Sequence, residues 1–133
     1  MANFSEGQLQ DMAQSLHDVG EELGQVRLNA IHAGKGLGDP QIVQLLGQNL
    51  SLLNQSSSFA VQAAQVALDD VEGAVSEVQG ATGTAMATLA GLQRLDKAIR
   101  VGASVIVLGS SVFTGNPQQI GNAAQGVLAA AGS

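Results

Sequence analysis

The sequence predicts an all-α protein: an elongated up-and-down bundle of three to four amphipathic helices that associates with further copies of itself. Three observations predict this class. Apolar residues recur at alternating steps of 3 and 4 along most of the chain, the spacing of helices that pack nearly parallel or antiparallel. The composition is 45% hydrophobic but only 2% aromatic, so the core is built from small side chains that bury little area each. Residues 101–133 carry no charge at all. No linker interrupts the 133 residues, which indicates a single helical domain over 1–133.

The first helix is expected over about residues 5–34. Ser5 and Gln8 match a capping box, in which the two side chains satisfy free backbone N–H groups at a helix start. A bundle seam follows at heptad spacing and ends near the glycines of the 34–38 segment, which favour a helix C-terminus. Its members are Leu9, Met12, Leu16, Val19, Leu23, Val26, Ala30 and Ala33.

The second helix is expected over 40–79, because Asp39 and Pro40 are typical of an N-cap and a first helical position. A second stripe beside its seam widens the buried face over the first two thirds. Residues 54–58 (NQSSS) have poor helix propensity and leave two interpretations open: an unbroken helix with a polar layer at Ser57, or a joint. The seam begins with Val43, Leu46, Leu50 and Leu53 and continues to Val78, and the parallel stripe contains Ile42, Leu45, Leu52, Phe59, Ala63 and Val66.

Two further helices are expected, over 84–114 and 117–131. The segment Gly80–Thr84 is rich in glycine and threonine and predicts a break before the third helix. Asn116 and Pro117 repeat the cap and proline pattern of Asp39 and Pro40, so they predict the start of the last helix.

The uncharged segment 101–133 is predicted to be an apolar helical hairpin that another surface must cover. Its first arm, 101–113, is about 20 Å long at ~1.5 Å per residue, too short for a hydrocarbon layer of ~30 Å. Its second arm contains glutamine and asparagine, which need hydrogen-bond partners in lipid. We therefore expect it to lie at the core of an oligomer or, alternatively, to contact membrane lipid on assembly. The residues expected at this contact are Val101, Val105, Ile106, Leu108, Val112, Phe113, Ile120, Val127 and Leu128.

A basic flank, Arg94, Lys97 and Arg100, directly precedes this hairpin. Long cationic side chains next to an apolar segment suit lipid headgroups. The alternative is that they pair with acidic residues such as Asp69, Asp70 and Asp96.

Several function classes are excluded or disfavoured by the residues present. A net charge of −6 argues against nucleic acid as a partner, because phosphate binding needs a basic surface. His17 and His32 lack the spacing of a helical zinc site, and no catalytic, cofactor-binding or small-molecule signature is found. The first ten residues do not resemble a secretory signal, so we expect synthesis in the cytoplasm. We expect the final location to be a virion or a target membrane.

Together these features predict a non-enzymatic, self-assembling structural protein, the subunit of a helical ring, tube or virion-type assembly. The layout of an apolar hairpin on long amphipathic helices resembles bacteriophage ejection or virion-interior proteins and α-helical pore-forming toxins, in plan and composition only. That resemblance implies two alternatives in turn: a phage-type virion component, or an effector that inserts the hairpin into a membrane. A third alternative is a small adaptor that binds a partner helix along the alanine-rich seam from Ala60 to Val78.

Overall fold

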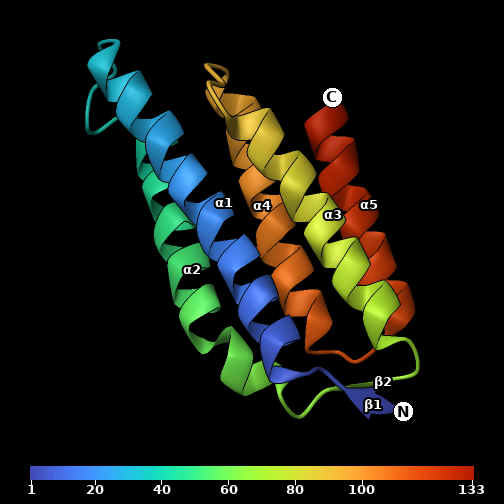
Figure 1. The fold of residues 1–133 in the computed structure, drawn as a ribbon. Coiled ribbons are helices and arrows are strands. Elements are labelled where there is room, and N and C mark those ends of the chain that lie inside the picture. The colour runs from blue at the N-terminus through green and yellow to red at the C-terminus, as the bar shows by residue number, and fades with distance from the viewer.

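Five α-helices lie side by side in an elongated bundle (Figure 1). This computed structural model describes all of residues 1–133. The all-α prediction is confirmed, with five helices in place of the three or four expected. The elements are β1 (Ala2–Asn3), α1 (Glu6–His32), α2 (Pro40–Ala63), β2 (Ala67–Leu68), α3 (Val71–Leu89), α4 (Leu95–Val112) and α5 (Pro117–Gly132).

The helices form two layers. In the first layer α4 lies between α2 and α5 and contacts both. The second layer is α1, which packs on α2 and α4, and α3, which packs on α4 and α5. α4 therefore contacts every other helix and is the centre of the bundle. Successive helices run in opposite directions, so the turns between them gather at the two ends of the molecule (Figure 1).

The predicted starts of three helices are confirmed. Ser5 and Gln8 form the complete capping box at the start of α1. The Asp39 side chain accepts a hydrogen bond from the Gln41 N–H, and Asn116 accepts one from the Gln118 N–H in the same way. Each of these last two helices has its proline in the first turn.

The predicted helix 40–79 is wrong, because α2 ends at Ala63 and a new helix starts at Val71. Between them β2 pairs antiparallel with β1, which brings Leu68 into the core at 1% exposure. Asp70 then caps α3 by accepting a hydrogen bond from the Gly73 N–H at 2.9 Å. Alanines on both sides of the break preserved the heptad spacing, and this concealed the end of the helix.

The segment 54–58 lies inside α2 without a joint, so the interpretation of an unbroken helix is the correct one. The hydroxyls of Ser56 and Ser57 donate to the Leu53 carbonyl at 2.9 and 2.8 Å. These bonds satisfy the serine side chains within the helix itself. The buried polar residue of this segment is Ser56, however, whereas Ser57 is exposed.

The predicted helix 84–114 is also wrong in its boundaries. α3 continues through Gly80–Thr84, where Thr82 is buried and donates its hydroxyl to the Val78 carbonyl at 2.8 Å. The chain turns instead at residues 90–94, where Gly91 has a φ of +69°. A left-handed backbone conformation favours glycine, so this turn fixes the break between α3 and α4.

The hydrophobic core is one cluster of 27 buried residues drawn from all five helices and from Phe4 and Leu68. Its largest fully buried side chains are Phe59 and Met12, followed mainly by leucines. Phe59 of α2 and Phe113 at the end of α4 pack with ring centroids 5.4 Å apart, which joins two helices of the first layer near one end.

Candidate functional site

Charge is distributed unevenly over the two layers of the bundle. α1 and α3 carry seven of the 11 acidic residues, whereas α2 and α5 carry no charged residue of either sign. In α4 the charges are confined to the first two turns. The helices of the first layer therefore present an almost wholly uncharged exterior.

We define the uncharged surface as the exposed side chains of α2, of α4 beyond Arg100, and of α5. It is the candidate functional site, because exposed helix faces without charge continue here over three neighbouring helices. Its exposed members include Val43, Gln44, Gly47, Leu50, Ser51, Asn54, Ser57, Val61 and Gln62 of α2, Ala103, Val107 and Ser110 of α4, and Gln118, Gln119, Asn122, Gln125, Gly126, Leu128 and Ala129 of α5.

The α2 part of this surface is not among the predicted contact residues, although its signal is present in the sequence. Residues 40–68 contain no charged residue, and neither do residues 101–133. Joining 40–68 to the acidic segment after it, as one helix to residue 79, concealed this similarity. Only the fold brings the two uncharged segments together, since α4 packs against α2.

Large apolar side chains project from the α2 part of the surface. Val43, Leu50 and Val61 are 55%, 51% and 78% exposed. Separations of 7 and 11 residues place them within about 20° of one line along an α-helix. They form an apolar row on a helix face that the monomer leaves uncovered.

The α4 and α5 part of the surface is mainly polar. A shallow groove of about 590 Å³ lies between these helices, and Val107 at its rim is 59% exposed. Six of its nine lining residues carry a hydroxyl or amide group, which can donate or accept hydrogen bonds, although carbon atoms form most of its surface. The polar lining residues are Ser104, Ser110, Ser111, Thr114, Gln119 and Asn122.

Two glutamines of α2 fix the spacing between α2 and α4. The Nε2 atoms of Gln48 and Gln55 donate to the carbonyls of Ile99 and Ile106, at 2.8 and 3.2 Å. Each glutamine side chain lies directly over a glycine of α4, Gly102 or Gly109, where an added Cβ would overlap its amide oxygen. The first layer is thus held by a contact that repeats every seven residues.

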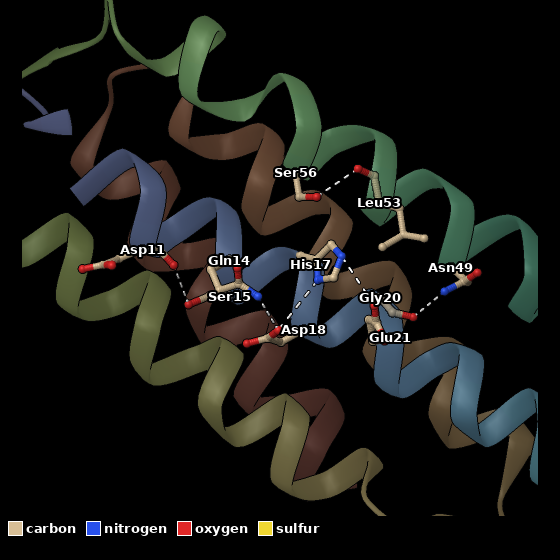
Figure 2. Close-up of polar contacts among 10 residues, drawn as sticks. All are labelled: Asp11, Gln14, Ser15, His17, Asp18, Gly20, Glu21, Asn49, Leu53 and Ser56. Atoms are coloured by element: carbon tan, nitrogen blue, oxygen red, sulfur yellow. Dashed lines mark hydrogen bonds and ion pairs between the residues drawn. The ribbon is translucent and has the colours of Figure 1, made fainter. Parts of the chain in front are cut away.

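The contact between α1 and α2 is equally close (Figure 2). The Asn49 Nδ2 atom donates to the Gly20 carbonyl at 2.6 Å, and a Cβ at Gly20 would lie 3.1 Å from the Leu52 Cβ. Because Gly20 has no side chain, α1 approaches α2 closely here.

His17 lies beside this contact and is the only histidine near carboxylates. Its Nε2 is 3.5 Å from the Glu21 carboxylate and its Nδ1 is 3.8 Å from that of Asp18 (Figure 2). The nearby hydroxyls of Ser15 and Ser56 donate to the carbonyls of Asp11 and Leu53, at 3.0 and 2.9 Å. This arrangement presents no nucleophile hydrogen-bonded to the imidazole.

The apolar residues predicted to contact a partner or lipid lie mostly inside the chain's own bundle. Six of them are fully buried, Ile106 and Phe113 are half-buried, and Leu128 is 43% exposed. In this conformation the buried six contact the other helices of the same chain and are not available to a second surface. These six are Val101, Val105, Leu108, Val112, Ile120 and Val127.

The predicted bundle seam lies in the core on α1 but not on α2. Leu9, Leu16 and Leu23 are buried, whereas Leu46 and Leu53 are half-buried and Leu50 is exposed. α2 buries the parallel stripe instead, because that stripe retains large side chains as far as Phe59 while the seam changes to Ser57 and Ala60. The buried stripe comprises Ile42, Leu45, Leu52, Phe59 and Ala63, with Gln48 and Ser56.

The basic flank is partly paired within its own turn of helix. Arg94 and Arg100 lie 3.1 and 3.2 Å from the Asp96 carboxylate, and Lys97 has no acidic partner. The hydrogen bond from Arg94, followed by those from the Lys97 backbone and Arg100, lowers the pKa of Asp96 below its usual 3.8. Asp69 and Asp70, also expected as partners, lie at the other end of the bundle.

No three His, Cys, Asp or Glu side chains are grouped so that they could hold a metal ion. None of the five helices combines the length and the hydropathy needed to cross a membrane. Comparison with protein-family models, curated proteins and solved structures finds no match to this chain.

Proposed function

We propose that this protein is a non-enzymatic, self-assembling structural subunit of a helical ring, tube or virion-type assembly, and that copies join through the uncharged surface. The single observation that supports this most is that the exposed side chains of α2, of α5 and of α4 beyond Arg100 carry no charge. The cores of protein interfaces are depleted of charged residues, whereas an ordinary exposed helix face is rich in them.

The apolar row of α2 adds to this argument. Val43 and Leu50 are members of the heptad seam that the monomer leaves exposed, whereas Leu46 and Leu53 of the same seam are half-buried. A seam of this spacing is what a second helix covers when two helices pack side by side. Large apolar side chains in one row mark an interaction site more strongly than the same residues scattered singly.

A pore-forming effector remains the alternative, and it places a different demand on the chain. Val105, Leu108 and Val112 are buried by the chain's own helices, so insertion into lipid requires the bundle to open first. A self-assembling subunit uses the exposed surface of the folded bundle as it stands. This difference favours the structural subunit.

The adaptor alternative loses the surface on which it was based. The seam from Ala60 to Val78 is not one helix, because it is interrupted by β2. A partner helix could still bind along the exposed apolar row of α2. That row is the surface proposed here for contact with a second copy.

The test introduces one charge into the apolar row and one outside the uncharged surface. Leu50→Asp places a carboxylate in the row, and Gln79→Asp places one on α3, outside the uncharged surface; both positions are exposed, so both variants should fold. Light scattering during size-exclusion chromatography measures the mass of each.

We expect a wild-type mass that is a multiple of 13.4 kDa, a much smaller mass for Leu50→Asp, and little change for Gln79→Asp. A wild-type protein that stays monomeric at high concentration would contradict self-assembly. Leakage of lipid vesicles by the folded wild-type protein would favour the pore-forming effector instead.

A further inference from the structure

The charges of this protein are also segregated along the length of the bundle. All five lysine and arginine residues belong to segments near one end of the bundle, where α1, α3 and α5 finish and α2 and α4 begin; Figure 1 shows these helix ends together. Only two acidic residues, Asp39 and Asp96, share this end, which leaves it a formal charge of +3. We call it the basic end; its cations are Arg27, Lys35, Arg94, Lys97 and Arg100.

The opposite end carries acidic residues and no lysine or arginine. Glu6 lies in the first turn of α1, Asp69 and Asp70 directly precede α3, and Glu72 lies in its first turn. All four are exposed, and none forms an ion pair in the structure. We call this the acidic end.

The two ends cannot neutralise one another within one molecule. The 27 residues of α1 span about 40 Å at ~1.5 Å per residue. Electrostatic attraction between exposed charges is largely screened beyond the Debye length, which is about 10 Å at 0.1 M salt. Only a second molecule can bring a basic end and an acidic end into contact.

The basic end also offers apolar surface around its charges. An open cavity of about 700 Å³ lies between the C-terminal turns of α1 and the turn that joins α3 to α4. Val26, Leu92 and Leu95 contribute to its lining, and Lys35 lies at the same cavity. Leu37, in the neighbouring turn, is 69% exposed. Burial of this apolar surface would add to the attraction between opposite charges.

We propose that the basic end of one copy docks on the acidic end of the next, so that copies add head to tail. This inference rests on the proposed self-assembly but uses a different surface from the uncharged one. A head-to-tail contact joins two unlike patches, and it produces an open array unless the geometry closes into a ring.

The test reverses the charge of each end separately. One variant combines Lys35→Glu with Lys97→Glu at the basic end. The other combines Glu6→Lys, Asp69→Lys and Glu72→Lys at the acidic end, so that the formal charge of the basic end changes from +3 to −1 and that of the acidic end from −4 to +2. None of these positions is buried, and circular dichroism checks that both variants fold. Sedimentation velocity then measures assembly of each variant alone and of an equimolar mixture.

Each variant alone presents ends of like charge and should lose head-to-tail association, with an association constant lowered roughly tenfold or more. The mixture should recover it, because each reversed end then finds a complementary end on the other variant. Failure of the mixture to recover association would overturn the proposal.

Two further outcomes separate this proposal from the proposed function and from a membrane role. If Leu50→Asp abolishes all association while the charge reversals have no effect, the uncharged surface stands and the head-to-tail contact is wrong. If the charge reversals act and Leu50→Asp does not, the head-to-tail contact stands without the uncharged surface. Co-sedimentation of the wild type with anionic vesicles, lost on reversal of the basic end and with no recovery in the mixture, would assign the basic end to lipid instead.

Discussion

At the scale of single residues, the contact between α2 and α4 depends on two glycines that leave room for glutamine. Gly102 and Gly109 are buried in the middle of α4, where glycine ordinarily lowers helix stability. Their benefit is that Gln48 and Gln55 reach over them to the carbonyls of Ile99 and Ile106. The polar contact is therefore possible because glycine has no side chain at these two positions.

This arrangement predicts opposite effects for two similar substitutions. Gly102→Ala should lower the free energy of unfolding by about 1–3 kcal/mol, because the new Cβ displaces Gln48 and would lie 3.0 Å from the Leu23 Cδ1. Gly83→Ala is the control. It lies in an exposed part of α3 with no atom near the new Cβ, and it should raise stability by up to about 1 kcal/mol.

Urea denaturation of the two variants and of the wild type measures these differences. A Gly102→Ala protein that is as stable as Gly83→Ala would show that the close contact with Gln48 is unimportant.

At the scale of elements, the break between α2 and α3 decides the architecture. Had the chain been one helix from 40 to 79, α3 would have extended away from the bundle and could not cover α4 and α5. The short β1 and β2 pairing and the Asp70 cap turn the chain back instead. The local devices that end one helix and start the next thus create the second layer.

The cap makes a prediction in which two adjacent aspartates behave differently. Asp70→Ala should lower the free energy of unfolding by about 0.5–2 kcal/mol, because the Gly73 N–H loses its acceptor. Asp69→Ala is the matched control, since Asp69 is exposed and accepts no side-chain hydrogen bond in the structure; it should have little effect.

Thermal unfolding followed by circular dichroism compares the pair. Equal effects of the two substitutions would contradict a helix start at this position, because in a continuous helix alanine would be favourable at both.

The elements also show what the sequence could and could not predict. Helix starts at Ser5, Asp39 and Asn116 were predicted correctly, because a cap is encoded by a few neighbouring residues. The helix ends at Ala63 and Leu89 are not predicted, because the alanines near them fit a continuing heptad pattern as well as they fit a helix end. The choice of Ile42, Leu45 and Leu52 over Leu46 and Leu50 for the core depended on packing between helices, which periodicity alone does not decide.

For the candidate site, the tail without charge was evident from the sequence, but its burial was not. Val101 and Val105 appear equally suited to a partner, to lipid or to the chain's own helices. Only the fold shows that α4 lies at the centre. The candidate contact surface therefore consists of the exposed side chains around these apolar residues, and not of the apolar residues themselves.

At the scale of the whole molecule, charge is separated in two directions, between layers and along the axis. The two proposed contacts should therefore respond differently to salt. Raising the ionic strength from 0.01 M to 1 M shortens the Debye length from about 30 Å to about 3 Å, which weakens the head-to-tail contact. It leaves contact through the uncharged surface largely intact, because apolar burial does not depend on charge screening.

Light scattering across this salt range gives the measurement. The average mass should fall with added salt to a smaller, salt-resistant oligomer, and Leu50→Asp should remove that remaining oligomer. A mass that rises steadily with salt would contradict an electrostatic contribution to assembly.

The odd number of helices gives the molecule a direction. Because the chain runs up and down five times, residue 2 lies at the acidic end and residue 132 lies at the basic end. In a head-to-tail array the last helix of one copy would therefore stand next to the first strand of its neighbour, and every copy would point the same way. A row of such subunits would be polar, with one end that exposes cations and another that exposes carboxylates, so that the two ends of the array could grow at different rates.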